Sequence, residues 1–348
     1  MGINTTLFRE IQDYLYDYGC NFEEMNHFLF ANNDFLNRQQ EAIEIINRVM
    51  TFHGKEELLT HVVELARVEH GIQELEPWVR DHVVHALLCY TLGIYINEKY
   101  LSFNGSNSIS HFQWKLAGLF HDIGYPAQIA RDIINPYTKK INEIRRRYVI
   151  NSQDIRINLI PVGLELLQNE QNGLDLIQSC LNQWNLDINA RGEYNRMVQD
   201  GRICHGIMSG LTLLNIVDVM YQYYNPLREY RDTYTYNMNI NWNQVNFEHQ
   251  VIPACSAIFI HNLPEDRFES SKLDPEIAPL PFLLKLTDIL QEWERPSLLN
   301  MMGYPSRDFD IAITTDRILR FFVNNDDIKR NIDRAIHNTL NVNNVLII

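Results

Sequence analysis

Several histidine and aspartate residues lie at the ends of apolar segments or inside them, where apolar side chains are the usual occupants. His121 and Asp122 end the apolar segment LAGLF, and Gly124 and Pro126, which are typical helix-stopping residues, follow them. Asp288 is surrounded by leucine and isoleucine in PFLLKLTDIL. Because an unpaired buried carboxylate is very costly, we expect Asp288 to be paired with a cation or bound to a metal.

Three further histidines have similar surroundings. His85 lies in HVVHALLCYTLG one helical turn after His82, so the two side chains can share a helix face. His205 begins HGIMSGLTLL, and His261 ends AIFIH. Imidazole and carboxylate ligands without thiolates suit one or two divalent ions of Mn, Mg, Co, Zn or Fe, and the residue types alone do not choose among these metals.

The order of these residues resembles the metal-binding pattern of the HD superfamily of phosphohydrolases. A lone histidine in HALLCYTLG, an adjacent His-Asp pair in HDIG and a distant aspartate match that pattern, namely His85, His121, Asp122 and Asp288. His205 and His261 resemble the two additional histidines of the two-metal members. The resemblance covers roughly residues 79–293. It implies a helical bundle that binds divalent metal.

The resemblance also implies a role for each residue. The four matching positions would hold one ion, and His205 and His261 would hold a second ion that Asp122 bridges to the first. Asp122, His205 and His261 are therefore the candidate catalytic residues as well as candidate ligands. The ions would activate a water molecule for attack on a phosphate group.

Residues around the ligands have expected supporting roles. Asp81, four positions before His85, is a candidate to orient that imidazole. Arg80, Lys285 and Arg295 are candidates to contact the phosphates of a substrate. The sequence leaves open whether His82 or His249 joins the site.

Two features depart from the family pattern. The interval of 83 positions between Asp122 and His205 (205 − 122) is long for a two-metal member, so we expect inserted helices in about 135–201. Tyr125 stands where the HD-GYP cyclic-dinucleotide phosphodiesterases carry a lysine. Membership of that subgroup is therefore not favoured. The basic stretch 139–147 is interrupted by Glu143 and is expected to be a solvated helix face, and a local cradle for an anionic ligand is the alternative.

The elements that must position these residues are helices, because apolar residues recur with a period near 3.6 over most of the chain. We expect a mainly α, HD-domain-like helical bundle. The predicted helices span 38–52, 56–70, 76–95, 110–122, 154–168, 175–185, 205–223, 253–261 and 279–294. FDIAIT and RILRFFV, separated by a short polar turn, predict a small C-terminal β-hairpin, and a final helix is expected from about Asp326.

The pattern predicts three parts. Residues 1–70 form an N-terminal helical segment, 71–300 an HD-type metal-binding catalytic domain, and 301–348 the C-terminal hairpin and helix. The five cysteines are scattered without a CxxC pair, which is typical of buried thiols in a reducing cytoplasm. No apolar run approaches the roughly 20 residues that cross a bilayer, so no membrane association is expected.

The net charge of −14 disfavours stable binding of duplex nucleic acid and favours a small phosphorylated, nucleotide-like substrate. The leading hypothesis is a metal-dependent phosphohydrolase that cleaves a phosphate ester or anhydride. Two alternatives stay open: a di-iron oxygenase of the HD type, and a catalytically silent HD module that senses nucleotides. The sequence permits a homo-oligomer and does not specify one.

Overall fold

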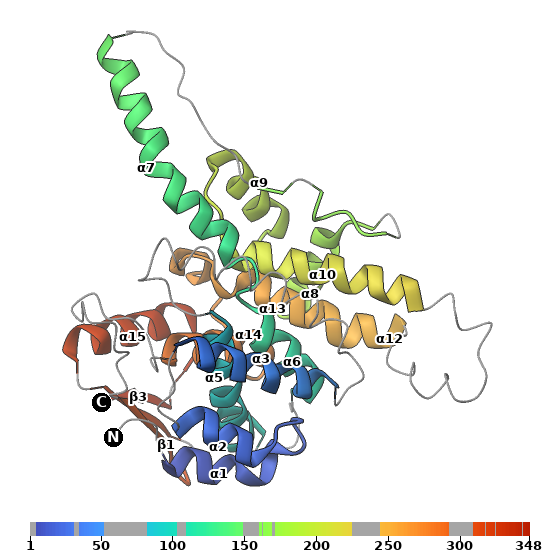
Figure 1. Cartoon of the computed structure of the whole chain (residues 1–348), viewed down its shortest axis with the longest axis vertical. Coiled ribbons are helices and arrows are strands. Elements are labelled where there is room, and N and C mark those ends of the chain that lie inside the picture. Colours follow the sequence, from blue (N-terminus) through green and yellow to red (C-terminus); the bar gives the residue numbers. More distant parts are fainter. Residues whose placement is uncertain are drawn as a thin grey trace.

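The structure is a computed structural model that describes residues 5–30, 35–51, 82–102, 109–148, 160–161, 163–168, 171–224, 244–291, 309–316, 318–323, 325–342 and 344–348. Within these ranges the chain is mainly α-helical and has a small three-stranded sheet near its C-terminal end (Figure 1). The predicted mainly α class is therefore confirmed.

Five helices form the centre of the fold and position the predicted ligands. They are α5 (His82–Ile96), α6 (His111–Phe120), α10 (His205–Tyr224), α13 (Ile252–His261) and α14 (Pro279–Leu290). Nearly every side chain of α5 and α13 is buried, as expected for helices that are apolar on all sides and surrounded by other helices. α13 packs against α10, α14, α6 and α8 (Gly173–Gln183), so it lies in the middle of the bundle (Figure 1).

The close approach of α10 and α13 depends on glycine. A Cβ atom at Gly210 would lie only 2.7 Å from the carbonyl oxygen of Cys255 and 2.9 Å from the backbone nitrogen of Phe259. No side chain fits there, so the two helix backbones meet directly. This contact holds together the two helices that carry His205 and His261.

Three N-terminal helices, α1 (Thr5–Leu15), α2 (Phe22–Phe30) and α3 (Phe35–Thr51), lie beside this centre, and both α1 and α3 pack against α5 (Figure 1). Lys115 of α6 is fully buried and donates a hydrogen bond to the carbonyl oxygen of Val49 in α3 (3.2 Å). A π-helical turn (Asn97–Leu101) extends α5. The helix predicted for 56–70 lies outside the described residues.

α7 (Tyr125–Tyr148) begins just after the His-Asp pair and extends away from the bundle (Figure 1). The sequence predicts only a helix stop at Gly124 and Pro126. The chain instead turns over residues 121–124 and begins a new helix, because proline is well tolerated in the first turn. The basic stretch 139–147 lies in the outer half of α7, where its Lys and Arg side chains are exposed, as expected.

The predicted insertion contains the end of α7, α8 and α9 (Ala190–Asp200), and α8 corresponds to the helix predicted for 175–185. The helix predicted for 154–168 is wrong over its described residues, 160–161 and 163–168. There Gly163 has a φ of +95°, and Leu166 pairs with Asn172 in an isolated β-bridge. Both features are incompatible with a continuous helix.

The C-terminal region confirms the predicted hairpin and final helix. β1 (Phe309–Ile313) pairs antiparallel with β2 (Leu319–Val323), and α15 (Asp326–Thr339) follows. β3 (Val345–Ile347), which the sequence does not predict, pairs parallel to β2. The hydroxyl of Tyr95 in α5 accepts a hydrogen bond from the backbone N–H of Ile313 (3.1 Å), which ties β1 to the bundle.

Shorter elements complete the described fold: α12 (Gln244–Asn246) and a π-helical turn (Phe247–Val251) precede α13, and a 3₁₀ turn (Glu265–Phe268) precedes α14. α14 ends at Leu290, four residues before its predicted end, because the backbone of Gln291 leaves the helical conformation (ψ 90°). Among the described helices, none is by itself long and apolar enough to cross a membrane. Only α9 and the first part of α10 taken together reach the necessary length and composition, and these two helices are bent by 115° relative to each other.

Candidate metal centre

All six predicted ligands converge, and the carboxylate of Asp122 lies at their centre. Its Oδ2 atom lies 3.6 Å from Nε2 of His85 and 3.6 Å from Nε2 of His121. Its Oδ1 atom lies 3.3 Å from Nε2 of His205 and 3.4 Å from Nε2 of His261. The two oxygens of one carboxylate therefore face two different pairs of imidazoles.

Asp288 belongs to the Oδ2 half of this centre. Its Oδ1 atom lies 3.3 Å from Nε2 of His85, whose Nε2 atom is also 3.2 Å from Nε2 of His121. The side chains of His121 and His261 are completely inaccessible, whereas those of His205 and Asp288 are 12% and 25% exposed. The centre is therefore shielded from solvent on the side of His121 and His261 and accessible to solvent on the side of His205 and Asp288.

The turn that carries Asp122 is fixed against α10. The backbone N–H of Gly124 donates to the hydroxyl of Ser209 (2.8 Å). A Cβ atom at Gly124 would lie 2.6 Å from the backbone nitrogen of Ser209, so the turn can approach α10 only with glycine at this position. The HDIG sequence thus places Asp122 between α6, which precedes it, and α10, which carries His205.

The hydrogen bonds of the rings determine which nitrogen is free to bind. Nδ1 of His121 lies 3.0 Å from the carbonyl oxygen of Gly118, and Nδ1 of His261 lies 2.6 Å from that of Ile258. A carbonyl oxygen only accepts, so each Nδ1 must carry the proton. Nε2 of the neutral ring is then an acceptor, and it faces the carboxylate of Asp122.

Side-chain amides orient the other two imidazoles. Nδ1 of His85 lies 2.6 Å from Oε1 of the fully buried Gln291. Oε1 of Gln128 in α7 lies 2.9 Å from Nδ1 of His205, and Nδ2 of Asn262 lies 3.0 Å from the same nitrogen. In both rings Nε2 is again the nitrogen that points to the carboxylates.

This arrangement fits a cation. Asp122 Oδ1 and His261 Nε2 are buried and have no hydrogen-bond partner within the part of the chain that the structure describes. Two acceptors facing each other in a buried site repel unless a cation lies between them. His121, Asp122 and His261 also form a group whose ligand atoms all lie within 4.8 Å of one another. The residues present therefore form a candidate metal-binding cluster.

Cys89 completes a second group of this kind with His85, His121 and Asp288. Its Sγ atom lies 3.5 Å from Nε2 and 3.6 Å from Nδ1 of His85. Nearly equal distances to both nitrogens place the sulfur beside the ring and away from the outward direction of Nε2. An ion in line with Nε2 would be out of reach of the sulfur, so we interpret Cys89 as a packing residue.

The protonation states also favour binding of a cation. Burial lowers the pKa of His121 and lowers that of His205 to about 3. Burial opposes ionisation of Asp122, but the imidazoles of His121 and His205 outweigh it and hold the pKa of this carboxyl well below its usual value. Burial also opposes ionisation of Asp288, but the contact with His85 holds the pKa of this carboxyl well below its usual value. At neutral pH His121 and His205 are therefore neutral imidazoles, and Asp122 and Asp288 are ionised carboxylates.

His82, which the sequence leaves open, is buried beside the centre. Its Nε2 atom is 3.9 Å from Asp122 Oδ2, and its ring lies against that of Tyr125, with ring centroids 3.6 Å apart. His249, the other open candidate, is exposed on the π-helical turn before α13, where its carbonyl oxygen accepts from Gln113 (2.7 Å). His82 therefore joins the centre, and His249 has no described contact with it.

Lys285 has a different place from the one expected. Its Nζ atom donates to the carbonyl oxygen of His261 (2.6 Å) and lies 5.8 Å from the ring centre of Phe268. Burial lowers the pKa of Lys285, and the charge of Asp288 opposes that effect. The ammonium is thus held by an internal contact. Arg80, Asp81 and Arg295 lie outside the described residues.

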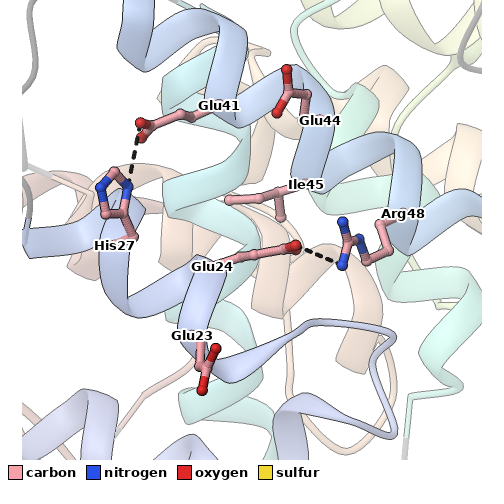
Figure 2. A pocket seen from close by; sticks show the side chains of 7 residues that line it. All are labelled: Glu23, Glu24, His27, Glu41, Glu44, Ile45 and Arg48. Atoms are coloured by element: carbon pink, nitrogen blue, oxygen red, sulfur yellow. Dashed lines mark ion pairs between the residues drawn. The ribbon is translucent and has the colours of Figure 1, made fainter.

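A separate hollow lies between α2 and α3 and contains none of these residues (Figure 2). It has a volume of about 340 Å³. Figure 2 shows Glu41 turned toward His27 (3.3 Å) and Glu24 turned toward Arg48 (2.6 Å). Four glutamates line it: Glu23, Glu24, Glu41 and Glu44.

No protein-family model matches the chain, and neither a curated protein nor a solved structure matches it. The class of site therefore rests on the geometry, which is that of a mainly helical protein with a buried His/Asp cluster able to bind metal.

Proposed function

We propose that this protein is a metal-dependent phosphohydrolase that cleaves a phosphate ester or anhydride of a small nucleotide-like molecule. The observation that carries the proposal is the position of Asp122, whose two oxygens face separate pairs of imidazoles. A carboxylate in this position is suited to bridge two cations. The order of the six ligands, which resembles that of the HD superfamily, supports the same assignment.

Each residue has a distinct task in this proposal. His85, His121 and Asp288 hold one ion on the Oδ2 side of Asp122, and His205 and His261 hold the other on the Oδ1 side. When bound, two divalent ions polarise a phosphoryl oxygen and lower the pKa of a coordinated water, so that hydroxide is available at neutral pH.

The substrate approaches from the side of His205 and Asp288, because the opposite side is closed by completely buried rings. His82 packs against Tyr125, whose ring also contacts His205, and is the farthest of the five imidazoles from Asp122, so we assign it to contact the substrate phosphate rather than an ion. The net charge of −14 makes a small ligand, which the centre can capture locally, a better substrate than duplex nucleic acid.

The test combines metal analysis with turnover. The metal-free protein is loaded with Mn²⁺, Co²⁺, Mg²⁺ or Zn²⁺ and incubated with nucleoside mono- and triphosphates, cyclic nucleotides and bis(p-nitrophenyl) phosphate. We expect phosphate or nitrophenol release that Asp122→Asn abolishes together with metal binding. His249→Asn, which changes an exposed histidine outside the centre, is the matched control and should behave as the parent protein.

Two results would overturn the proposal in favour of the alternatives. Iron bound after anaerobic purification, with oxygen consumption and no phosphate release, would indicate an oxygenase. Tight binding of one nucleotide without turnover under any metal condition would indicate a sensor.

A further inference from the structure

α14 carries three buried or half-buried polar residues at intervals of three: Lys285, Asp288 and Gln291, the last just after the helix ends. Residues three apart lie side by side on a helix surface. Only Asp288 is a proposed ligand. The other two contact histidines on two different helices, and these histidines belong to opposite halves of the metal centre.

Gln291 contacts the Oδ2 half. Its Oε1 atom lies 2.6 Å from Nδ1 of His85, and its side chain is completely buried. An amide oxygen in this position keeps the proton on Nδ1, which leaves the Nε2 lone pair directed at an ion. His85 and Asp288 meet at 3.3 Å, so Gln291 supports the ring that shares an ion with the carboxylate three residues before it.

Lys285 contacts the Oδ1 half. α13 ends at His261, and a helix leaves its last carbonyl groups without partners from its own backbone. Nζ of Lys285 donates to the carbonyl oxygen of His261 at 2.6 Å, so the last residue of α13 is held by α14. The imidazole of that same residue faces Asp122 Oδ1.

We infer that Lys285 and Gln291 are positioning residues, each specific for one half of the metal centre. Gln291 sets the affinity for the ion beside Asp288, and Lys285 sets the affinity for the ion between His205 and His261. α14 thereby fixes the spacing of the two ions through contacts that flank its own ligand. This inference rests on the proposed two-ion site.

The test measures the binding of two equivalents of Mn²⁺ by calorimetry and by competition with a chelating dye. Lys285→Met and Gln291→Met remove the hydrogen bond and keep an unbranched side chain of similar length. Each variant should lower the affinity for one ion by about 10- to 100-fold and leave the affinity for the other ion unchanged. Thr287→Val, at a buried position of α14 whose hydroxyl contacts only its own helix in the described structure, is the matched control and should change neither affinity.

Double mutants identify the affected ion. Gln291→Met should have no further effect on Mn²⁺ binding in an Asp288→Asn background and its full effect in a His261→Asn background. Lys285→Met should show the opposite pattern. The inference would be overturned if each variant lowered the affinity for both ions equally, or if it lost thermal stability with both affinities unchanged.

Conservative variants keep the test decisive if the methionine variants do not fold. Gln291→Glu retains an oxygen acceptor beside His85 and should change the affinity of the Asp288-side ion alone, whereas Lys285→Arg should act on the other ion alone. A parent protein that binds two Mn²⁺ ions but hydrolyses no phosphate substrate would refute the proposed hydrolase and leave this inference standing. A parent that binds no ion would refute both.

Discussion

The buried imidazole of His205 should make the metal-free protein sensitive to mild acid. Its side chain is only 12% exposed, and burial lowers its pKa from 6.5 to about 3. Below pH 6.5 the unfolded chain takes up a proton at this residue, whereas the folded chain does not do so until about pH 3. Stability is therefore full above pH 6.5 and declines as the pH falls through this window.

The two pKa values set the size of the effect. Because of the difference between these two pKa values, His205 alone lowers the free energy of unfolding by about 2 kcal/mol when the pH falls from 7.5 to 5. Burial lowers the pKa of His121 in the same direction, so this residue adds to the loss. Asp122 and Asp288 do not oppose it, because their pKa values lie below the usual value of 3.8 and both remain ionised at pH 5.

The assay is chemical denaturation in the presence of a chelator, at pH 7.5 and pH 5, followed by circular dichroism and tryptophan fluorescence. The parent should lose about 2 kcal/mol more than His205→Asn when the pH is lowered. His337→Asn, at an exposed position on α15, is the control and should keep the pH dependence of the parent. Equal pH dependence of the parent and His205→Asn would refute a buried, neutral imidazole at this position.

Two further predictions concern helix packing and His82. Gly210→Ala should destabilise the fold by about 1–3 kcal/mol in chemical denaturation, because its Cβ would lie 2.7 Å from a backbone oxygen of α13. Gly192→Ala, whose nearest neighbours are atoms of the Asn189 side chain, should cost less, and equal losses would contradict the close helix contact. His82→Asn should retain both metal ions and lower kcat in steady-state assays, whereas loss of an ion would make His82 a ligand.

The sequence predicts the core helices well and identifies the His and Asp side chains that the fold brings together, because both follow from short-range patterns. α10, α13 and the start of α14 lie where apolar periodicity places them, and a polar residue inside such a pattern is conspicuous. The sequence pattern does not predict α7, which begins at Tyr125, because proline can begin a helix as well as end one. The predicted helix is wrong at 163–168, where an apolar stretch forms a turn and a β-bridge to Asn172.

The contacts that orient the ligands are harder to predict, because they come from residues far away in the sequence. Gln291 reaches His85 across 206 positions, and Gln128 reaches His205 across 77. Neither amide stands out by type or surroundings. The spacing of Gln291, three residues after Asp288, is the one local signal that could have identified it.

The position of each histidine in its helix explains which kind of partner orients it. His121 and His261 lie at the C-terminal ends of α6 and α13, and each ring contacts the carbonyl oxygen three residues earlier on its own chain. Such carbonyl oxygens are available because the last turn of a helix lacks further backbone donors.

His205 lies in the first turn of α10, where backbone N–H groups, not carbonyl groups, are exposed. Its Nδ1 atom therefore needs an acceptor from elsewhere, which Gln128 supplies. Nδ1 of His85 also faces a distant side chain, that of Gln291. A histidine that closes an apolar helix is thus oriented by its own backbone, whereas one that opens a helix depends on a distant side chain. A substitution can remove a side-chain amide, but it cannot remove a backbone carbonyl group. Mutation of Gln291 or Gln128 can therefore change the geometry of the ligands while every ligand is retained.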